Sequence, residues 1–149
     1  MKTKTLSESN FELWTLIGRL NHIIVLHRQK ELSLYKMPLR QLHVLRTIKA
    51  LGPKATLSEV AKQVERELNV ISRQAVRMEK DGLINRIKDT PKSNQLRFEL
   101  TDKGLHMAQV SGQSQSLDVI FSSLSNTEHQ QMAKMLKKAL KQANKYYSD

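Results

Sequence analysis

Residues 55–84 read ATLSEVAKQVERELNVISRQAVRMEKDGLI, and this stretch decides the fold. It contains two runs of apolar residues at helical spacing, separated by a short turn. In the second run, Ile71, Ala75 and Met78 mark one face of a helix that ends at Gly82, while polar and cationic side chains occupy the other face. The stretch therefore predicts a helix-turn-helix whose second helix packs through one face and is free to bind through the other.

Capping signals predict where these two helices begin and end. Thr56 and Glu59 have the spacing of a capping box, so we expect the first helix to begin there and to run to about Glu65. In the turn that follows, Leu68 is expected to fill the angle between the helices and Asn69 to cap the second helix. At this point an ordinary helical hairpin with solvated charges is an open alternative.

The residues after Gly82 favour a DNA-binding fold over that alternative. Residues 83–88 are extended in character, residues 89–94 are a turn cluster, and residues 95–100 alternate polar and apolar side chains. This order predicts a β-hairpin whose buried side contains Leu96, Phe98 and Leu100. A lone hairpin is marginally stable in water, so it must lie against the helices. We therefore expect a mainly α chain with a small β-hairpin wing, that is, a winged helix-turn-helix.

Helices are expected on both sides of this module. Residues 10–31 form a helix that is apolar around most of its circumference, and such a helix is buried on more than one side. Because the chain is short, one side is expected to contact a second subunit; the alternative is a set of singly exposed apolar residues, which is common. Pro38 opens a further helix that Gly52 stops. After the hairpin, Thr101 opens another, whose middle at residues 111–116 is a poor helix former. A break there, or a close crossing of two helices, is an open alternative; we expect a bent but continuous helix.

The composition fits one small binding domain. The chain has 149 residues, a formal net charge of +11 and no Cys, which excludes disulfides and thiolate metal sites. Residues 36–103 contain 15 Lys and Arg against eight Asp and Glu, whereas residues 104–133 contain no Lys or Arg. A basic field of this kind attracts polyanions whatever their sequence. Charge alone would fit DNA, RNA or acidic lipid equally well.

Other functional classes find little support in the sequence. Residues 1–7 lack an apolar signal core, and no apolar run approaches the ~18 residues that span a bilayer, so a cytoplasmic protein without membrane association is expected. No Gly-rich phosphate loop, paired-histidine metalloprotease motif or cysteine nucleophile is present, so an enzyme is not expected. His22 and His27 lie off a shared helical face, and neither a metal site nor a cofactor is predicted.

Four groups of residues carry a resemblance to a known family. They are Met37–Gln41, Ser72-Arg73 with Arg77–Ile84, Leu100–Gly104, and Leu124–Glu128. In this order and spacing, over the whole chain, they resemble the MarR family of dimeric winged-helix transcriptional regulators. The resemblance implies an N-terminal dimerisation helix at residues 1–34, a DNA-binding winged helix-turn-helix at residues 35–103 and C-terminal dimerisation helices at residues 104–149.

The resemblance also implies how such a protein works. Each homodimer places its two recognition helices in major grooves of double-stranded DNA, and each wing tip reaches the adjacent minor groove. The family members are typically repressors that a small, often aromatic, ligand releases from DNA. This sequence departs from the family at the wing, where Lys92, Ser93 and Asn94 replace an Asp-Arg pair, so minor-groove contact is expected from Lys92 or Arg97.

Groove chemistry assigns roles to the residues of the second helix. Arg73 and Arg77 each fit a guanine edge, Asn69 fits adenine and Val76 fits a thymine methyl group, while Ser72 is a candidate phosphate contact. Which arginine reads a base and which holds a phosphate is left open. For a symmetric dimer the site is a pseudo-palindrome with half-sites about 10 bp, or a multiple of that, apart.

The sequence leaves two interpretations of function open. Tyr35 and His43, near the junction of the dimer core and the reading module, are candidates for a ligand pocket, although His43 also fits an ordinary surface or core histidine. The chain is then a ligand-controlled, sequence-specific repressor. The alternative is a sequence-tolerant basic protein of the nucleoid type, without ligand control.

Overall fold

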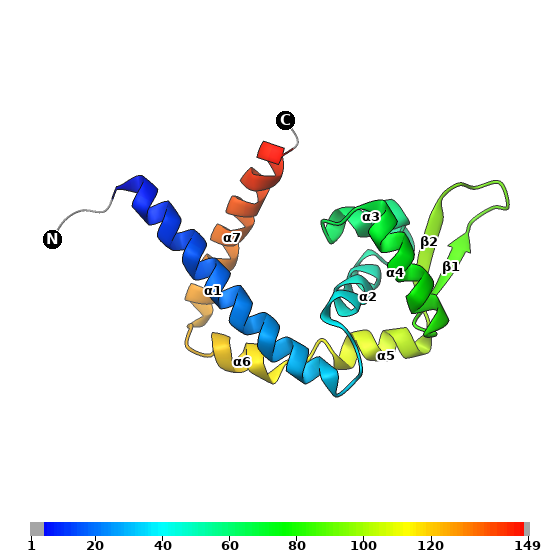
Figure 1. Cartoon of the computed structure of the whole chain (residues 1–149), viewed down its shortest axis with the longest axis horizontal. Coiled ribbons are helices and arrows are strands. Elements are labelled where there is room, and N and C mark those ends of the chain that lie inside the picture. The colour runs from blue at the N-terminus through cyan, green and yellow to red at the C-terminus, as the bar shows by residue number, and fades with distance from the viewer. Residues whose placement is uncertain (1–4, 148–149) are drawn as a thin grey trace. The chain divides into compact units, whose positions relative to one another are not determined.

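The computed structural model describes residues 5–147, so residues 1–4 and 148–149 of the expected dimerisation segments lie outside the described residues. The chain divides into two compact units, the first ending at Ser114 and the second beginning at Gln115 (Figure 1). The first unit contains α1 (Leu6–Ser33), α2 (Leu39–Leu51), the 3-10 helix η1 (Gly52–Lys54), α3 (Leu57–Gln63), α4 (Leu68–Lys80), β1 (Ile84–Lys88), β2 (Leu96–Leu100) and α5 (Asp102–Val110). The second contains α6 (Gln115–Phe121) and α7 (Asn126–Tyr147).

The first unit has a winged-helix core. Helices α2, α3 and α4 enclose apolar side chains, and the β1–β2 hairpin lies against them (Figure 1). Ile71, Ala75 and Met78 are each at most 1% exposed, as their spacing predicts. The mainly α fold with a β-hairpin wing is therefore confirmed.

The hairpin is antiparallel and is tied to the start of α3. Its register pairs Ile84 with Leu100 and Lys88 with Leu96. The amide of Phe98 donates to the carbonyl of Ala55 at 2.8 Å, which attaches the segment before α3 to the edge of β2. Phe98 is fully buried, so the predicted inner face of the wing is correct at its centre, although Leu96 and Leu100 are only half-buried.

Two expectations about the turn between α3 and α4 are wrong, the cap at Asn69 and the packing of Leu68 between the helices. Thr56 does cap α3, because its hydroxyl accepts from the Glu59 amide at 3.2 Å. However, α3 ends two residues early, since Glu65 adopts a left-handed conformation with φ of +53° and reverses the chain. The reversal lets α4 begin at Leu68, which leaves Asn69 inside the first turn instead of at the cap and leaves Leu68 51% exposed.

The expected continuous helix after the wing is also wrong. α5 ends at Val110 and α6 begins at Gln115. The residues between them favour helix weakly. In addition, the Arg28 guanidinium of α1 donates to the carbonyls of Ser111 at 2.5 Å and of Gln113 at 3.4 Å, which provides partners for backbone groups that a helix would otherwise use. A residue 83 positions earlier in the chain therefore stabilises the break.

Both long helices expose apolar residues. α1 is longer than predicted because a capping box formed by Thr5 and Glu8 extends its start. The exposed apolar side chains of α1 are Leu6, Phe11, Leu13, Trp14, Leu16, Ile17, Ile23 and Leu26. Those of α7 are Met135, Leu136, Leu140 and Tyr146. Within residues 5–147, no helix combines the length and the apolar character needed to cross a membrane.

Candidate nucleic-acid interface

The free face of α4 gathers the residues that the sequence singled out on this helix. Asn69, Arg73, Val76 and Arg77 are exposed, and Ser72 is half-buried beside them. At 3.6 residues per turn, the four exposed residues lie on the side opposite the buried stripe, and Ser72 lies between the two faces. The structure thus brings the predicted base-reading residues together on one ridge.

The two arginines of this ridge take little part in holding the fold. The Nε of Arg73 donates a long hydrogen bond of 3.4 Å to the carbonyl of Asn69 on the preceding turn. The Arg77 guanidinium has no ion pair or hydrogen bond with any residue that the structure describes. Both side chains therefore remain available for an external acceptor. A guanidinium presents paired donors that match the O6 and N7 of guanine.

An ion pair fixes the wing against the end of α4. Arg86 of β1 donates from its Nε to the Glu79 carboxylate at 2.7 Å, and its backbone amide donates to the same carboxylate at 3.1 Å. The Arg86 side-chain hydrogen bonds are the main reason that the pKa of Glu79 lies below its ordinary value. The sequence analysis missed this pair, although opposite charges seven residues apart across Gly82 were a usable signal.

The two candidate groove contacts of the wing, Arg97 and Lys92, differ in how far the fold engages them. Arg97 is engaged by two carboxylates, Glu99 at 2.8 Å and Asp89 at 3.0 Å, and these hydrogen bonds raise the pKa of its guanidinium. Lys92 is exposed in the turn between the strands, and no described residue pairs with its amine. Lys92 is therefore the available cation of the wing tip, and Arg97 is occupied within the hairpin.

The residues around Thr101 join the wing, α4 and α5. The hydroxyl of Thr101 donates to the carbonyl of Gly82 at 2.6 Å and accepts from the Gly104 amide at 3.0 Å, which caps α5. Lys103 donates from Nζ to the carbonyl of Asp81 at 2.7 Å, at the C-terminal end of α4. The fragment from Leu100 to Gly104 is therefore a structural junction that holds α4 in place.

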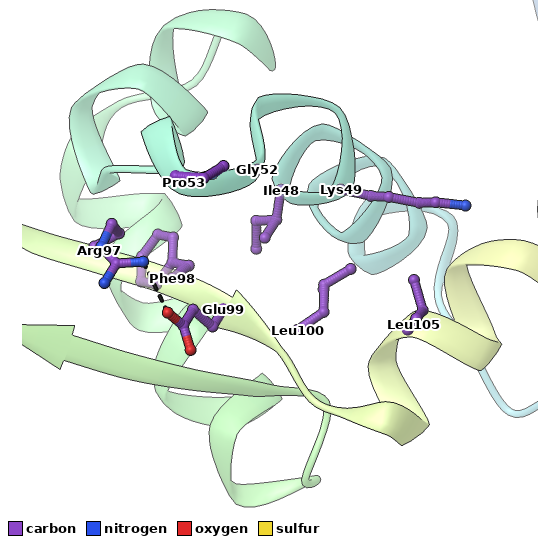
Figure 2. Close-up of a pocket in the computed structure, with 9 residues that line it drawn as sticks. All are labelled: Ile48, Lys49, Gly52, Pro53, Arg97, Phe98, Glu99, Leu100 and Leu105. Carbon is purple, nitrogen blue, oxygen red and sulfur yellow. Dashed lines mark hydrogen bonds and ion pairs between the residues drawn. The ribbon is translucent and has the colours of Figure 1, made fainter.

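A shallow pocket of about 370 Å³ lies behind the wing, between α2, η1, β2 and α5 (Figure 2). Its lining residues are Ile48, Lys49, Gly52, Pro53, Arg97, Phe98, Glu99, Leu100 and Leu105. Figure 2 shows the Arg97 guanidinium directed to the Glu99 carboxylate, so the charged groups of this pocket largely satisfy one another. The pocket offers mainly apolar contact and contains none of the predicted α4 residues.

A second, larger pocket of about 930 Å³ lies in the first unit beside the junction of α1 and α2. Its lining residues are Asn21, Val25, Gln29, Ser33, Lys36, Met37, Pro38, Leu39, Arg40, His43 and Arg66. His43 thus lies where a ligand was expected, whereas Tyr35 is not part of the lining. Partial burial, together with the nearby cations Arg46, Arg28 and Arg66, lowers the pKa of His43, which favours the neutral imidazole. The cations around this pocket favour an anionic occupant.

No metal centre is evident in the part of the chain that the structure describes, where no three His, Asp or Glu side chains are grouped to hold an ion. The candidate site consists of the exposed face of α4 and the tip of the wing.

The comparisons with known proteins support this interpretation of the fold. Residues 37–91 match the model of the MarR family. Curated protein sequences include none with significant similarity to this chain. Solved structures do match. MepR of S. aureus, in complex with DNA, is 22% identical with a TM-score of 0.74, over 86% of this chain and 94% of MepR.

Two other solved structures cover still more of this chain. A mutant of MarR from E. coli, complexed with operator DNA, is 22% identical with a TM-score of 0.75, over 92% of this chain and 99% of MarR. The organohalide-sensing regulator RdhR-CbdbA1625, bound to 2,4-dichlorophenol, is 24% identical with a TM-score of 0.76, over 93% of this chain and 85% of that regulator. Residues 37–91 therefore match the MarR family model, and the chain as a whole has the same fold as these solved structures.

Proposed function

We propose that this protein is a transcriptional repressor that binds a pseudo-palindromic operator in double-stranded DNA as a homodimer. The observation that carries the proposal is the ridge of α4, where the two arginines are exposed and take little part in holding the fold while the opposite face is buried. The major groove of B-DNA is wide enough to admit an α-helix, and it presents a different donor and acceptor pattern for each base pair. A cationic, hydrogen-bonding ridge on a rigid helix suits that groove.

The ridge divides into reading and positioning contacts. Arg73 and Arg77 face guanine edges, Asn69 faces adenine, and Val76 contacts a thymine methyl group. Ser72, half-buried at the side of the ridge, donates to a phosphate. Lys92 supplies the wing contact in the minor groove or on the adjacent backbone. Arg97 acts indirectly, because its ion pairs shape the hairpin that presents Lys92.

The exposed apolar residues of α1 support the homodimer. Phe11, Leu13 and Trp14 are each more than half exposed, and their side chains fall on more than one face of the helix. Large apolar surfaces of this kind on a protein usually mark an interface. A second copy of the chain covers this surface in the proposal, and the dimer then presents two α4 ridges at a fixed separation.

The larger pocket supports control by a small aromatic or phenolic ligand. Lys36, Arg40 and Arg66 line it together with apolar side chains, and this combination suits an aromatic ring that carries an acidic group. RdhR-CbdbA1625, which has a similar fold, binds 2,4-dichlorophenol. A ligand releases DNA only if it binds better to one separation of the two ridges than to the other. His43 lines this pocket as a neutral acceptor for the ligand's hydroxyl group.

Competition binding tests the proposal most simply. The operator found by selection is labelled, and random duplex is added at physiological salt; a specific repressor prefers its operator by about 10³-fold or more. Arg73→Ala is expected to cost about 1–3 kcal/mol on the operator and much less on random duplex. Equal binding to operator and random duplex would instead support the sequence-tolerant nucleoid-type protein.

Ligand control is tested separately from sequence recognition. A panel of aromatic acids and phenols is added to the operator complex, with Arg40→Gln as a variant of the pocket. Release of wild-type protein by at least one compound, reduced in the variant, supports the pocket. A full panel without effect on operator affinity would contradict ligand control and leave a constitutive repressor.

A further inference from the structure

Arg28 of α1 is a buried cation that the proposed DNA contacts do not use. It is 4% exposed, and its guanidinium bonds to three acceptors: the Ser111 carbonyl at 2.5 Å, the Gln113 carbonyl at 3.4 Å and the Glu31 carboxylate at 2.5 Å. Ser114 adds a hydrogen bond of 2.9 Å from its hydroxyl to the same carboxylate. We call Arg28 and Glu31 the α1 clamp, because from one helix they hold the chain just beyond α5.

The chemistry of the clamp suits the end of a helix. The last carbonyls of a helix lack partners within it, and they carry the negative end of the helix dipole. The planar guanidinium has five donors in a fixed fork, so it can bind two carbonyls and a carboxylate at once. A buried charge is costly unless it is paired and hydrogen-bonded. Glu31 pairs with Arg28 from the same helix, but the remaining donors of Arg28 have their carbonyl partners only while the residues after α5 stay in place.

The other end of α5 is attached to the DNA-reading elements. Lys103 bonds to the carbonyl of Asp81 directly after α4, and Thr101 bonds to the carbonyl of Gly82. Gly104 lies against the backbone of Leu83. α5 is thus joined to the end of α4 at its start and to α1 beyond its end, so it transmits the position of one to the other as a short rigid rod.

We propose that Arg28 is a positioning residue that sets the separation of the two α4 ridges in the dimer. The inference rests on the proposed function, in which α1 contributes to the dimer interface and α4 reads DNA. The clamp then links the helix that faces the partner subunit to the rod that carries the reading helix. Loosening the clamp leaves the ridge itself intact but widens the range of separations that the dimer accepts.

Operators with altered spacing test this role. About 10–10.5 bp make one turn of 34–36 Å, so each inserted base pair moves one half-site by about 3.4 Å and rotates it by about 35°. Duplexes with zero, one or two base pairs inserted between the half-sites are titrated with wild type, Arg28→Lys and Lys30→Gln. Arg28→Lys keeps the charge but loses the fork; Lys30→Gln removes a charge from an exposed neighbour on the same helix.

The expected result is a change in spacing tolerance. Wild type and Lys30→Gln lose about 10-fold or more in affinity per inserted base pair, and Arg28→Lys loses about 3-fold or less, with unchanged base preference within each half-site. Wild-type spacing discrimination in a folded Arg28→Lys protein would overturn the inference. If circular dichroism shows that Arg28→Lys is unfolded, Glu31→Gln replaces it, with the same two outcomes. A wild type without any two-half-site preference would refute the proposed function instead.

Discussion

Replacement of Gly104 by Ala tests the junction on which the position of α4 depends. A Cβ at this position would lie 1.9 Å from the carbonyl oxygen of Leu83 and 2.9 Å from its carbonyl carbon. Cβ contacts below 3.0 Å are essentially never seen, so the start of α5 and the start of β1 must separate by about 1 Å. The obstacle is backbone, which cannot rotate away as a side chain would.

The magnitude follows from what this separation disturbs. Overpacking of a well-packed site costs about 1–3 kcal/mol. The same shift stretches the Thr101 amide bond to Leu83 at 3.1 Å and the Thr101 hydroxyl bond to Gly82 at 2.6 Å, each of which contributes about 1 kcal/mol. Gly104→Ala is therefore expected to lower the free energy of unfolding by about 3–5 kcal/mol.

Urea unfolding at one protein concentration measures the effect, with Gly82→Ala as the matched control. Gly82 has open space around its Cβ position but a φ of +71°, so the same chemical change there costs only about 1 kcal/mol of backbone strain. The concentration is held constant because association with a second copy would shift apparent stability. A Gly104→Ala protein that is as stable as Gly82→Ala would show that close contact with Leu83 does not position the start of α5.

Three further predictions concern the wing, the turn and acid stability. Lys92→Ala should weaken binding to operator and random DNA alike, and it should lower the slope of log K against log salt concentration by about 0.9. Arg97→Ala should lower this slope less, because the charge of Arg97 is already paired. Equal slopes for the two variants would contradict the assignment. Glu65→Gly should raise the free energy of unfolding by up to about 1 kcal/mol, measured as a higher urea midpoint, since Gly accepts the φ of +53° without strain. The pKa of Glu79 is lowered by Arg86, so the stabilisation by this pair is present above the unfolded pKa of about 4.5 and is lost as pH falls through the folded value. Glu79→Gln should therefore be less stable than wild type at pH 7 and differ little from it near pH 2. A difference in unfolding free energy that does not change with pH would contradict the pairing.

The faces of the helices were predictable from the sequence, because burial follows periodicity. Ile71, Ala75 and Met78 had to share one side of α4, which left Arg73 and Arg77 on the other whatever the exact ends of the helix. The β-hairpin was also predictable, since its alternation and turn cluster are local signals. These two features were sufficient to infer a winged helix.

The errors have physical causes that the sequence pattern does not show: contacts with partners elsewhere in the chain and one unusual backbone conformation. The break after α5 depends on Arg28, 83 residues before Ser111. The end of α3 depends on Glu65 accepting a left-handed conformation that the residue type disfavours. The engagement of Arg97 depends on the hairpin register, which brings Asp89 within 3.0 Å of it. Composition marked residues 111–116 as a weak helix, but it did not show that Arg28 bonds there, that Glu65 turns left-handed or that Asp89 pairs with Arg97.

In the proposed dimer the α4 ridge reads base edges twice, at a fixed separation. Selection of bound sequences from a random pool of duplex DNA tests it directly, with wild type and Arg73→Ala selected in parallel. The account predicts that wild type enriches a pseudo-palindrome with half-sites about 10 bp, or a multiple of that, apart, and that Arg73→Ala loses preference at one symmetric pair of positions. A wild-type pool without an enriched motif, or the same motif from both proteins, would contradict it.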